Sequence, residues 1–462
     1  MLRRDALAQF SSAIARAGLS LLTAALLARA LGAEQRGMLS LALLLPTILS
    51  ALGRVGQESV SITFAGLYKA QRPALLSQTV AVAGFSGALA VVCVIAFYAL
   101  PVPKGSFGGL PDYAIYLGCL AAATAGLDLL LRSLLAGCGD VVGAALTSTV
   151  QAALMFLGAL AMMVLGGALK SALLLYALAP LLVSVAVVSR LRTHIRPLAG
   201  HLDLHFLVKS IRFGAPICLA SLAGLLVYRI DQGLLGYMVT DAEIGYYVVA
   251  VSMAEHVSAV PKSLSSAFGP SLYNSFNQRQ GQVPAVFRFT AVISAICAVL
   301  ALGAGPFAIR FIFGSLYSSS VVPFVLLIPG VAFLACSQVL ASYLLARERA
   351  KYSLYVGYST LVTNLVLNFL LIPQLGISGA ALASTFSYGG GLLLWMAFYH
   401  RESRVTARSL IPTWRDTTYV VSQMLALPRQ ARAWLTHSRL ESEGRRPLAS
   451  VTLTGVPPKG EE

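Results

Sequence analysis

The chain has 462 residues, of which 57% are hydrophobic and only 11% are charged, and its mean hydropathy is +0.77. Soluble domains carry about 25% charged residues, so this composition excludes a soluble globular protein and predicts an all-α, polytopic membrane protein. The net charge of +16 is a poor argument for nucleic-acid binding, because the Lys and Arg residues of the loops are concentrated on one side of the apolar segments.

Apolar segments of roughly 20 to 28 residues recur along the chain, and each can cross a hydrocarbon core of about 30 Å as a helix. They predict about twelve transmembrane helices. In chain order, their ranges are 9–31, 38–64, 75–100, 112–136, 141–165, 168–190, 210–238, 244–268, 286–305, 321–345, 352–372 and 377–399.

Basic residues follow a one-sided pattern in the loops between these segments. One set of loops is rich in them, with Lys69, Arg192 and Lys209 as examples, whereas the opposite set holds only Arg36, Lys104, Lys170 and Arg310. By the positive-inside rule the rich side is cytoplasmic, and an even number of spans places the N- and C-termini there.

The two halves of the chain resemble each other. Ala33-Glu34 recurs as Ala242-Glu243, and the sequence LLA at 134–136 recurs at 344–346, with nearly equal offsets. We therefore expect a parallel internal repeat, two six-helix bundles around a central cavity. The predicted units are an N-terminal bundle at 1–191, a cytoplasmic linker at 192–208, a C-terminal bundle at 209–400 and a partly disordered cytoplasmic tail at 401–462.

Polar residues form stripes at helical spacing within four of the spans. In the first two spans the stripes are Ser12, Arg16, Ser20 and Thr23, and Ser50, Arg54, Gln57 and Ser61. A charge at the bilayer centre costs roughly 2.5–3.5 kcal/mol, so these groups are expected to face protein or water. With the polar residues of the seventh and eighth spans, the predicted substrate-binding residues are Arg16, Arg54, Gln57, Tyr228, Arg229, Gln232, His256 and Lys262.

Three acidic residues in the same stripes are candidates for coupling transport to H⁺ or Na⁺: Glu58, Asp231 and Glu255. Two pairs, Arg54–Glu58 and Asp128–Arg132, are spaced i, i+4, so internal salt bridges are an alternative interpretation. The cysteines lie singly within the spans and predict no metal site and no disulfide, and no cofactor is expected apart from a coupling ion. Arg29, near a helix end, is expected to extend towards the membrane surface.

Basic groups in a wet cavity suit an anionic ligand, and hydroxyl and amide groups suit sugars. The residues alone therefore favour an amphiphile with a phosphate-linked, sugar-like head. A membrane-embedded enzyme is disfavoured, because the longest outer loop, PVPKGSFGGLPD, has one carboxylate, Asp112, and no His.

Three stretches resemble a known family: LGAEQRGMLSLALLL at 31–45, DAEIGYYVVAVSMAEHVSAVPKSLSSAFGPSLY at 241–273 and NLVLNFLLIPQLGISGAALASTFSY at 364–388. They are similar to polysaccharide flippases of the multidrug/oligosaccharidyl-lipid/polysaccharide exporter superfamily. The resemblance implies a multi-pass protein of a bacterial inner membrane that moves undecaprenyl-diphosphate-linked oligosaccharides by alternating access, with polysaccharide-assembly proteins as possible partners.

The related peptidoglycan-precursor flippases bind pyrophosphate through basic residues on helices 1, 2 and 8, which by position implies roles for Arg16, Arg54 and Lys262. Those relatives have two further helices where this chain has a polar tail, which argues against a peptidoglycan role. Two alternatives remain open at this point: a drug or metabolite exporter of the same superfamily, and a non-transporting membrane scaffold for polysaccharide assembly.

Overall fold

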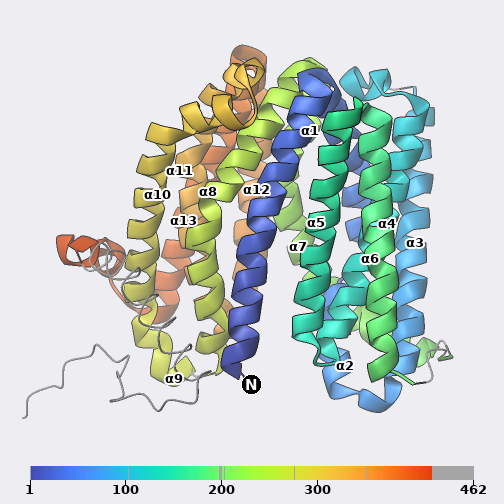
Figure 1. Cartoon of the computed structure of the whole chain (residues 1–462). Coiled ribbons are helices and arrows are strands. Elements are labelled where there is room, and N and C mark those ends of the chain that lie inside the picture. Colours follow the sequence, from blue (N-terminus) through green and yellow to red (C-terminus); the bar gives the residue numbers. More distant parts are fainter. Residues whose placement is uncertain are drawn as a thin grey trace, which may run out of the picture.

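The computed structural model describes residues 2–101, 103–196, 200–201, 203–274, 276–349 and 351–418, and the regular elements within these ranges are all helices (Figure 1). The α-helices are α1 (Leu2–Gly53), α2 (Gln57–Leu67), α3 (Arg72–Ala99), α4 (Asp112–Gly137), α5 (Val141–Leu165), α6 (Leu169–His194), α7 (Leu204–Met238), α8 (Asp241–Asn274), α9 (Phe276–Arg279), α10 (Val283–Ile312), α11 (Val321–Ala346), α12 (Lys351–Leu375) and α13 (Ile377–Ser403). Short 3₁₀ turns connect several of them, including η2 (Gly105–Gly109), η4 (Ser315–Ser320) and η5 (Ala407–Leu410).

Ten segments of the described chain are long and apolar enough to cross a membrane. The first of them, Ser11–Leu67, has 57 residues and would measure about 85 Å as a straight helix, far more than a core of about 30 Å. It does not run straight, because Gly32 has non-helical backbone angles (φ 72°, ψ 176°). Glycine adopts a positive φ readily because it has no Cβ atom. The 34-residue α8, which packs along α1 and α11, is not one of the ten, so the count of about twelve passes stays a prediction.

The helices fall into two groups with α1 and α7 between them (Figure 1). One group contains α3 to α6, in which α4 packs against α3 and α6, and the other contains α8 and α10 to α13, in which α11 packs against α8 and α13. The predicted linker is shorter than expected among the described residues, because α6 continues to His194 and α7 already begins at Leu204.

One prediction of helix continuity is wrong. The span expected at 38–64 is interrupted between Gly53 and Gln57, where Val55 (φ 48°) and Gly56 (φ 72°) adopt left-handed backbone conformations. At this break the chain approaches α7 closely, since a Cβ added to Gly56 would overlap the carbonyl oxygen of Gly214. The stripe of Ser50, Arg54, Gln57 and Ser61 therefore does not lie on one face of a single helix.

Helix α1 meets the C-terminal group in what we call the contact zone, formed by residues 28–37 of α1, residues 241–245 of α8 and residues 311–317. Its centre is a reciprocal glycine contact: a Cβ on Gly37 would overlap the carbonyl oxygen of Asp241, and a Cβ on Gly245 would overlap that of Ala33. The backbones of α1 and α8 can approach this closely only because both positions lack a side chain.

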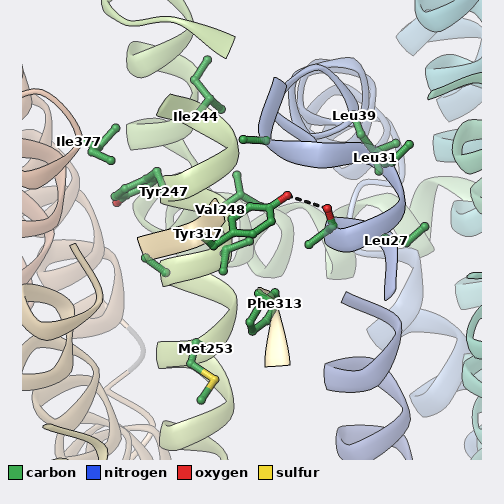
Figure 2. Packing of buried hydrophobic residues seen from close by; sticks show 14 of the residues in the cluster. Leu27, Leu31, Leu39, Ile244, Tyr247, Val248, Met253, Phe313, Tyr317 and Ile377 are labelled. Atoms are coloured by element: carbon green, nitrogen blue, oxygen red, sulfur yellow. Dashed lines mark hydrogen bonds between the residues drawn. The ribbon is translucent and has the colours of Figure 1, made fainter. Parts of the chain in front are cut away.

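Side-chain bonds to backbone carbonyls close the contact zone further. The Tyr317 hydroxyl donates to the Ala28 carbonyl at 2.8 Å, within a buried apolar cluster that Figure 2 shows. Arg29 Nε donates to the Ile312 carbonyl at 2.8 Å, and its Nη2 donates to the Phe311 carbonyl. Arg29 thus satisfies the last carbonyls of α10, which a helix leaves unpaired, rather than simply extending to the surface as expected.

The beginning of the predicted tail packs on the C-terminal group. α13 extends to Ser403, and Arg288 of α10 donates to Asp416 Oδ2 at 3.0 Å and to the Ser409 carbonyl at 2.6 Å. The prediction of partial disorder covers residues 401–462, of which 419–462 lie outside the described residues.

Candidate functional site

A cavity of about 510 Å³ lies between the two helix groups. Residues from α1, α4, α5, α6, α7 and α8 line it, so both groups contribute walls. The polar and charged lining residues are Arg16, Ser20, Thr23, Arg36, Arg132, Ser148, Gln151, Tyr176, Arg229, Ser252, Glu255 and His256. We call this space the central cavity.

The central cavity is strongly basic. Four arginines line it, whereas Glu255 is its only acidic lining residue, and Arg229 Nη2 lies 3.9 Å from Glu255 Oε1. Two contacts fix the position of the Arg132 side chain. It forms an ion pair with the fully buried Asp128, and its Nη1 donates to Ser148 Oγ at 2.8 Å. This arrangement presents positive charge to a water-accessible space and suits an anion.

Arg36 is the cavity arginine with the least compensation. Its side chain is buried, with 8% of its surface exposed, and its Nε atom has no hydrogen-bond partner among the described residues. Sequence reasoning assigned Arg36 to an outer loop, but helix resumes directly after Gly32 and carries this residue into the cavity wall.

A smaller chamber of about 220 Å³ adjoins the central cavity and shares four of its lining residues, Arg36, Tyr176, Arg229 and Val248. We call it the inner chamber. Ser40, Thr47 and Gln232 add polar groups to its wall. Ser40 Oγ donates to Gln232 Oε1 at 3.2 Å, while Gln232 Nε2 is buried without a partner in the described structure.

The structure brings five of the predicted binding and coupling residues to these two spaces. Arg16, Arg229, Glu255 and His256 line the central cavity, and Gln232 lines the inner chamber. His256 Nδ1 lies 2.7 Å from the Ser252 carbonyl, one turn earlier on α8.

Tyr228 and Lys262 form a separate pair between α7 and α8. Lys262 Nζ lies 5.3 Å from the centroid of the Tyr228 ring, which is cation–π distance, and the Tyr228 ring lies 6.2 Å from that of Tyr388. Neither Tyr228 nor Lys262 is among the lining residues of the central cavity.

Arg54, Gln57 and Glu58 lie at the break between α1 and α2, away from the central cavity lining. Arg54 Nε is 2.6 Å from Glu58 Oε1, and its Nη1 donates to Ser50 Oγ at 3.0 Å. Gln57 Oε1 accepts a hydrogen bond from Gln78 Nε2 at 3.1 Å. These groups are therefore paired with one another and with α3, as the salt-bridge interpretation of Arg54–Glu58 predicted.

Asp231 is turned away from the cavity into the C-terminal group. It is 2% exposed, and its Oδ2 accepts hydrogen bonds from the Tyr247 hydroxyl and from Ser384 Oγ, the latter at 3.3 Å. Asn364 Nδ2 donates to the same Ser384 hydroxyl at 3.3 Å. The result is a buried polar network that joins α7, α8, α12 and α13, and we call it the Asp231 network.

Asn368 extends the Asp231 network by one helical turn of α12. Its Nδ2 donates to Asn364 Oδ1 at 2.9 Å, whereas its own Oδ1 is buried without a partner in the described structure. In the described part of the chain no group of three or more His, Cys, Asp or Glu residues is arranged to hold a metal ion.

Sequence reasoning missed several lining residues, chiefly Arg36, Arg132, Ser148, Gln151 and Tyr176. A signal existed for some of them, because Ser148 and Gln151 are spaced i, i+3 and share one face of α5. Asn364 and Asn368 have the equivalent spacing i, i+4 on α12. Tyr176 and Arg36 carry no such pattern.

Comparison with solved structures places this architecture among membrane transporters. The chain is similar to the lipid II flippase MurJ in an inward closed conformation, with a TM-score of 0.68, 14% identity and 92% of each chain covered. It is also similar to an inward-facing multidrug resistance MATE family transporter of the MOP superfamily, with a TM-score of 0.65, 13% identity, and 87% of this chain and 99% of that chain covered. A third similar structure is a Vibrio cholerae MATE transporter, with a TM-score of 0.55, 12% identity, and 87% of this chain and 96% of that chain covered.

At these identities the likeness shows the fold alone, and the matched structures are transporters rather than enzymes. Comparison with curated protein sequences gives no match. A family model described as polysaccharide biosynthesis protein matches residues 2–273, more than half of the 462 residues. The chain is therefore a multi-pass membrane protein that belongs to the polysaccharide biosynthesis protein family and has the fold of MOP superfamily transporters.

Proposed function

We propose that this protein transports an undecaprenyl-diphosphate-linked oligosaccharide across a bacterial inner membrane by alternating access, with both termini in the cytoplasm. The diphosphate binds to arginines of the central cavity, and the sugars bind to its hydroxyl and amide groups. Polysaccharide-assembly proteins on either side of the membrane would supply the lipid-linked unit and receive it.

The observation that carries this proposal is the basic lining of the central cavity. Arg16, Arg36, Arg132 and Arg229 converge on one space of about 510 Å³, in which Glu255 is the only acidic lining residue and Asp128 pairs with Arg132 from outside the lining. A hydrogen bond to a charged group contributes roughly 1.5–3 kcal/mol, and guanidinium groups match phosphate oxygens in pairs. Ser20, Gln151 and Ser252 add the neutral partners that sugar hydroxyls need.

The same charges disfavour the two alternatives. A drug exporter for cations would place its ligand beside four guanidinium groups, which repel it. A scaffold without transport would have no use for a basic cavity in the membrane interior, where each unpaired charge is costly.

Two features support alternating access. The contact zone joins the helix groups through backbone contacts and buried apolar residues at the turn of α1, while the central cavity separates them at the level of Arg16. Among the described residues no ion pair crosses the contact zone, so its surfaces can separate without breaking one.

We also propose Asp231 as the group that couples transport to H⁺ or Na⁺. A carboxylate that is 2% exposed needs a proton or a cation to offset its burial, and no basic side chain hydrogen-bonds to it. The oxygens of Ser384, Asn364 and Asn368 are of the type that hard cations prefer. Glu58 is paired with Arg54 and Glu255 faces Arg229, so both are weaker candidates.

The transport proposal is tested with the purified protein in vesicles that contain a fluorescent polyprenyl-diphosphate oligosaccharide. A membrane-impermeant reductant added outside quenches only the labelled lipid in the outer leaflet, so the rate of further fluorescence loss measures movement between leaflets. We expect Arg16→Gln and Arg132→Gln to slow movement about tenfold or more. Arg190→Gln is the matched control, because Arg190 pairs with Asp140 at 3.1 Å outside the cavity lining. Movement at the wild-type rate in both cavity variants would contradict the proposal.

The coupling proposal is tested in the same vesicles with an imposed Na⁺ gradient or an imposed pH gradient. The gradient that accelerates the wild type identifies the ion. We expect Asp231→Asn to abolish that acceleration while binding of the lipid persists. If Glu58→Gln abolished it and Asp231→Asn did not, the assignment to Asp231 would be wrong.

A further inference from the structure

The inner chamber has more hydrogen-bond donors than its surroundings satisfy. Arg36 Nε and Gln232 Nε2 are both buried and lack a partner among the described residues. The side chains that carry them are 8% and 2% exposed. Buried polar groups in folded proteins are nearly always paired, so two unpaired donors in one wall are a strong indication of an absent acceptor.

The charge of the inner chamber is also uncompensated. Arg36 and Arg229 both line it, and no acidic residue does. Glu255 approaches Arg229 from the central cavity side, at 3.9 Å, and no ion pair to Arg36 is present in the described structure. A neutral ligand could accept hydrogen bonds here but would leave this positive charge unbalanced, whereas an anion would supply both acceptors and charge.

The position of the chamber separates it from the arginines proposed to hold the diphosphate. At 1.5 Å per residue, Arg16 lies about 24 Å from the turn at Gly32, and Arg36 lies about 6 Å from it on the following part of α1. The inner chamber is therefore nearer the contact zone, and the central cavity extends away from it. A ligand that spans both spaces would therefore place different parts of its length in the two spaces.

We propose that the glycan carried by this protein contains an acidic sugar, and that the inner chamber binds the carboxylate of that sugar. The inference rests on the proposed function, since it assigns the diphosphate to Arg16 and Arg132 and the glycan to the space beyond them. Arg36 and Arg229 bind the carboxylate oxygens, and Gln232 Nε2 donates to the same group or to a neighbouring ring oxygen. Ser40 and Thr47 bind hydroxyls of the sugar.

A matched pair of lipid-linked probes tests this inference. Both carry the same polyprenyl diphosphate and the same first sugars, and they differ only in one later residue, glucose in one and glucuronic acid in the other. The two residues differ only at C6, where a hydroxymethyl group is replaced by a carboxylate. Binding of each probe to the purified protein and its movement across vesicles are measured for the wild type, Arg36→Gln and Arg229→Gln.

We expect the wild type to bind and move the glucuronic acid probe about tenfold better than the glucose probe, because charged hydrogen bonds discriminate on this scale. Arg36→Gln and Arg229→Gln should each reduce this ratio towards one, because each variant slows the glucuronic acid probe more than the glucose probe. Arg190→Gln should leave the ratio unchanged. Movement of the glucose probe above the background of protein-free vesicles shows that a variant is folded.

Two other results would overturn the inference in distinguishable ways. If the wild type moved both probes equally, the acidic-sugar inference would be wrong and the proposed function would stand. If it moved neither probe, the proposed function would be contradicted, and the inference that rests on it would fall with it.

Discussion

The contact zone and the central cavity both lie along α1 where it faces the C-terminal group, and their chemistry is opposite. In the contact zone, backbone carbonyls accept from Tyr317 and Arg29, and glycines allow close packing around apolar side chains. In the central cavity, guanidinium groups line water-accessible space with little compensation. Close glycine packing and hydrogen bonds to carbonyls mark the level that holds α1 to the C-terminal group, and a charged, water-accessible lining marks the level proposed to receive a ligand.

The largest expected effect on this comparison comes from filling the reciprocal glycine contact. Gly37→Ala places a methyl group on the carbonyl oxygen of Asp241, and such overpacking costs about 1–3 kcal/mol or more of stability. Gly18→Ala, also on α1, has open space around its Cβ and is the control. We expect thermal unfolding in detergent to show a lower Tm for Gly37→Ala alone, and equal Tm values would show that the contact is looser than the structure indicates.

A second prediction separates stability from binding in the cavity. Arg36→Gln removes a buried charge that has no ion-pair partner in the described structure, so the ligand-free protein should gain about 1–3 kcal/mol of unfolding free energy. The same variant should lose most of the stabilisation that an acidic lipid-linked glycan provides. Chemical unfolding with and without the glycan measures both quantities. A loss of stability in the ligand-free variant would mean that Arg36 is compensated after all.

A third prediction concerns the hydroxyl of Tyr317. Tyr317→Phe keeps the ring and removes the donor to the Ala28 carbonyl, which should lower the free energy of unfolding by about 1 kcal/mol. Tyr246→Phe is the control, because that ring packs edge-on against Tyr317 at 5.9 Å and lies within the same cluster. The difference between the two variants in chemical unfolding measures the hydrogen bond. Equal values would assign the contribution of Tyr317 to its ring alone.

The smallest expected effect is at the break between α1 and α2. A double-mutant cycle with Arg54→Gln and Glu58→Gln should give a coupling energy of about 0.5–1 kcal/mol, since the pair is partly exposed and local. Binding of the lipid-linked glycan should be unaffected by the double variant. If the double variant lost binding, Arg54 would have to be counted among the ligand-binding residues, and the contrast between paired and unpaired arginines would be weaker.

The helices were largely predictable because apolar length and periodicity are local properties. The range 141–165 coincides with α5, and 321–345 differs from α11 by one residue. The break at Val55 and Gly56 was not predictable from hydropathy, because it follows from the close approach of α7 at Gly214.

The candidate site was predictable only in part. Helical spacing shows which residues share a face of one helix, but it does not show which other helix packs against that face. Arg16, Arg229 and Glu255 reach the cavity as their stripes suggest. Arg54 has the same local pattern but finds Glu58 and Ser50 instead. Asp231 differs again, because its partners Tyr247 and Ser384 come from other helices, α8 and α13.

The reciprocal glycine contact has a mechanical consequence. Two backbone contacts lie side by side, Gly37 on Asp241 and Gly245 on Ala33. In the alternating access proposed above, they would act as a fulcrum for tilting of the helix groups, and the first part of α1 would be a lever arm of about 24 Å between that fulcrum and Arg16. A tilt of roughly 10° would displace the far end of the arm by about 4 Å, enough to change the width of the cavity mouth while the contact itself hardly moves.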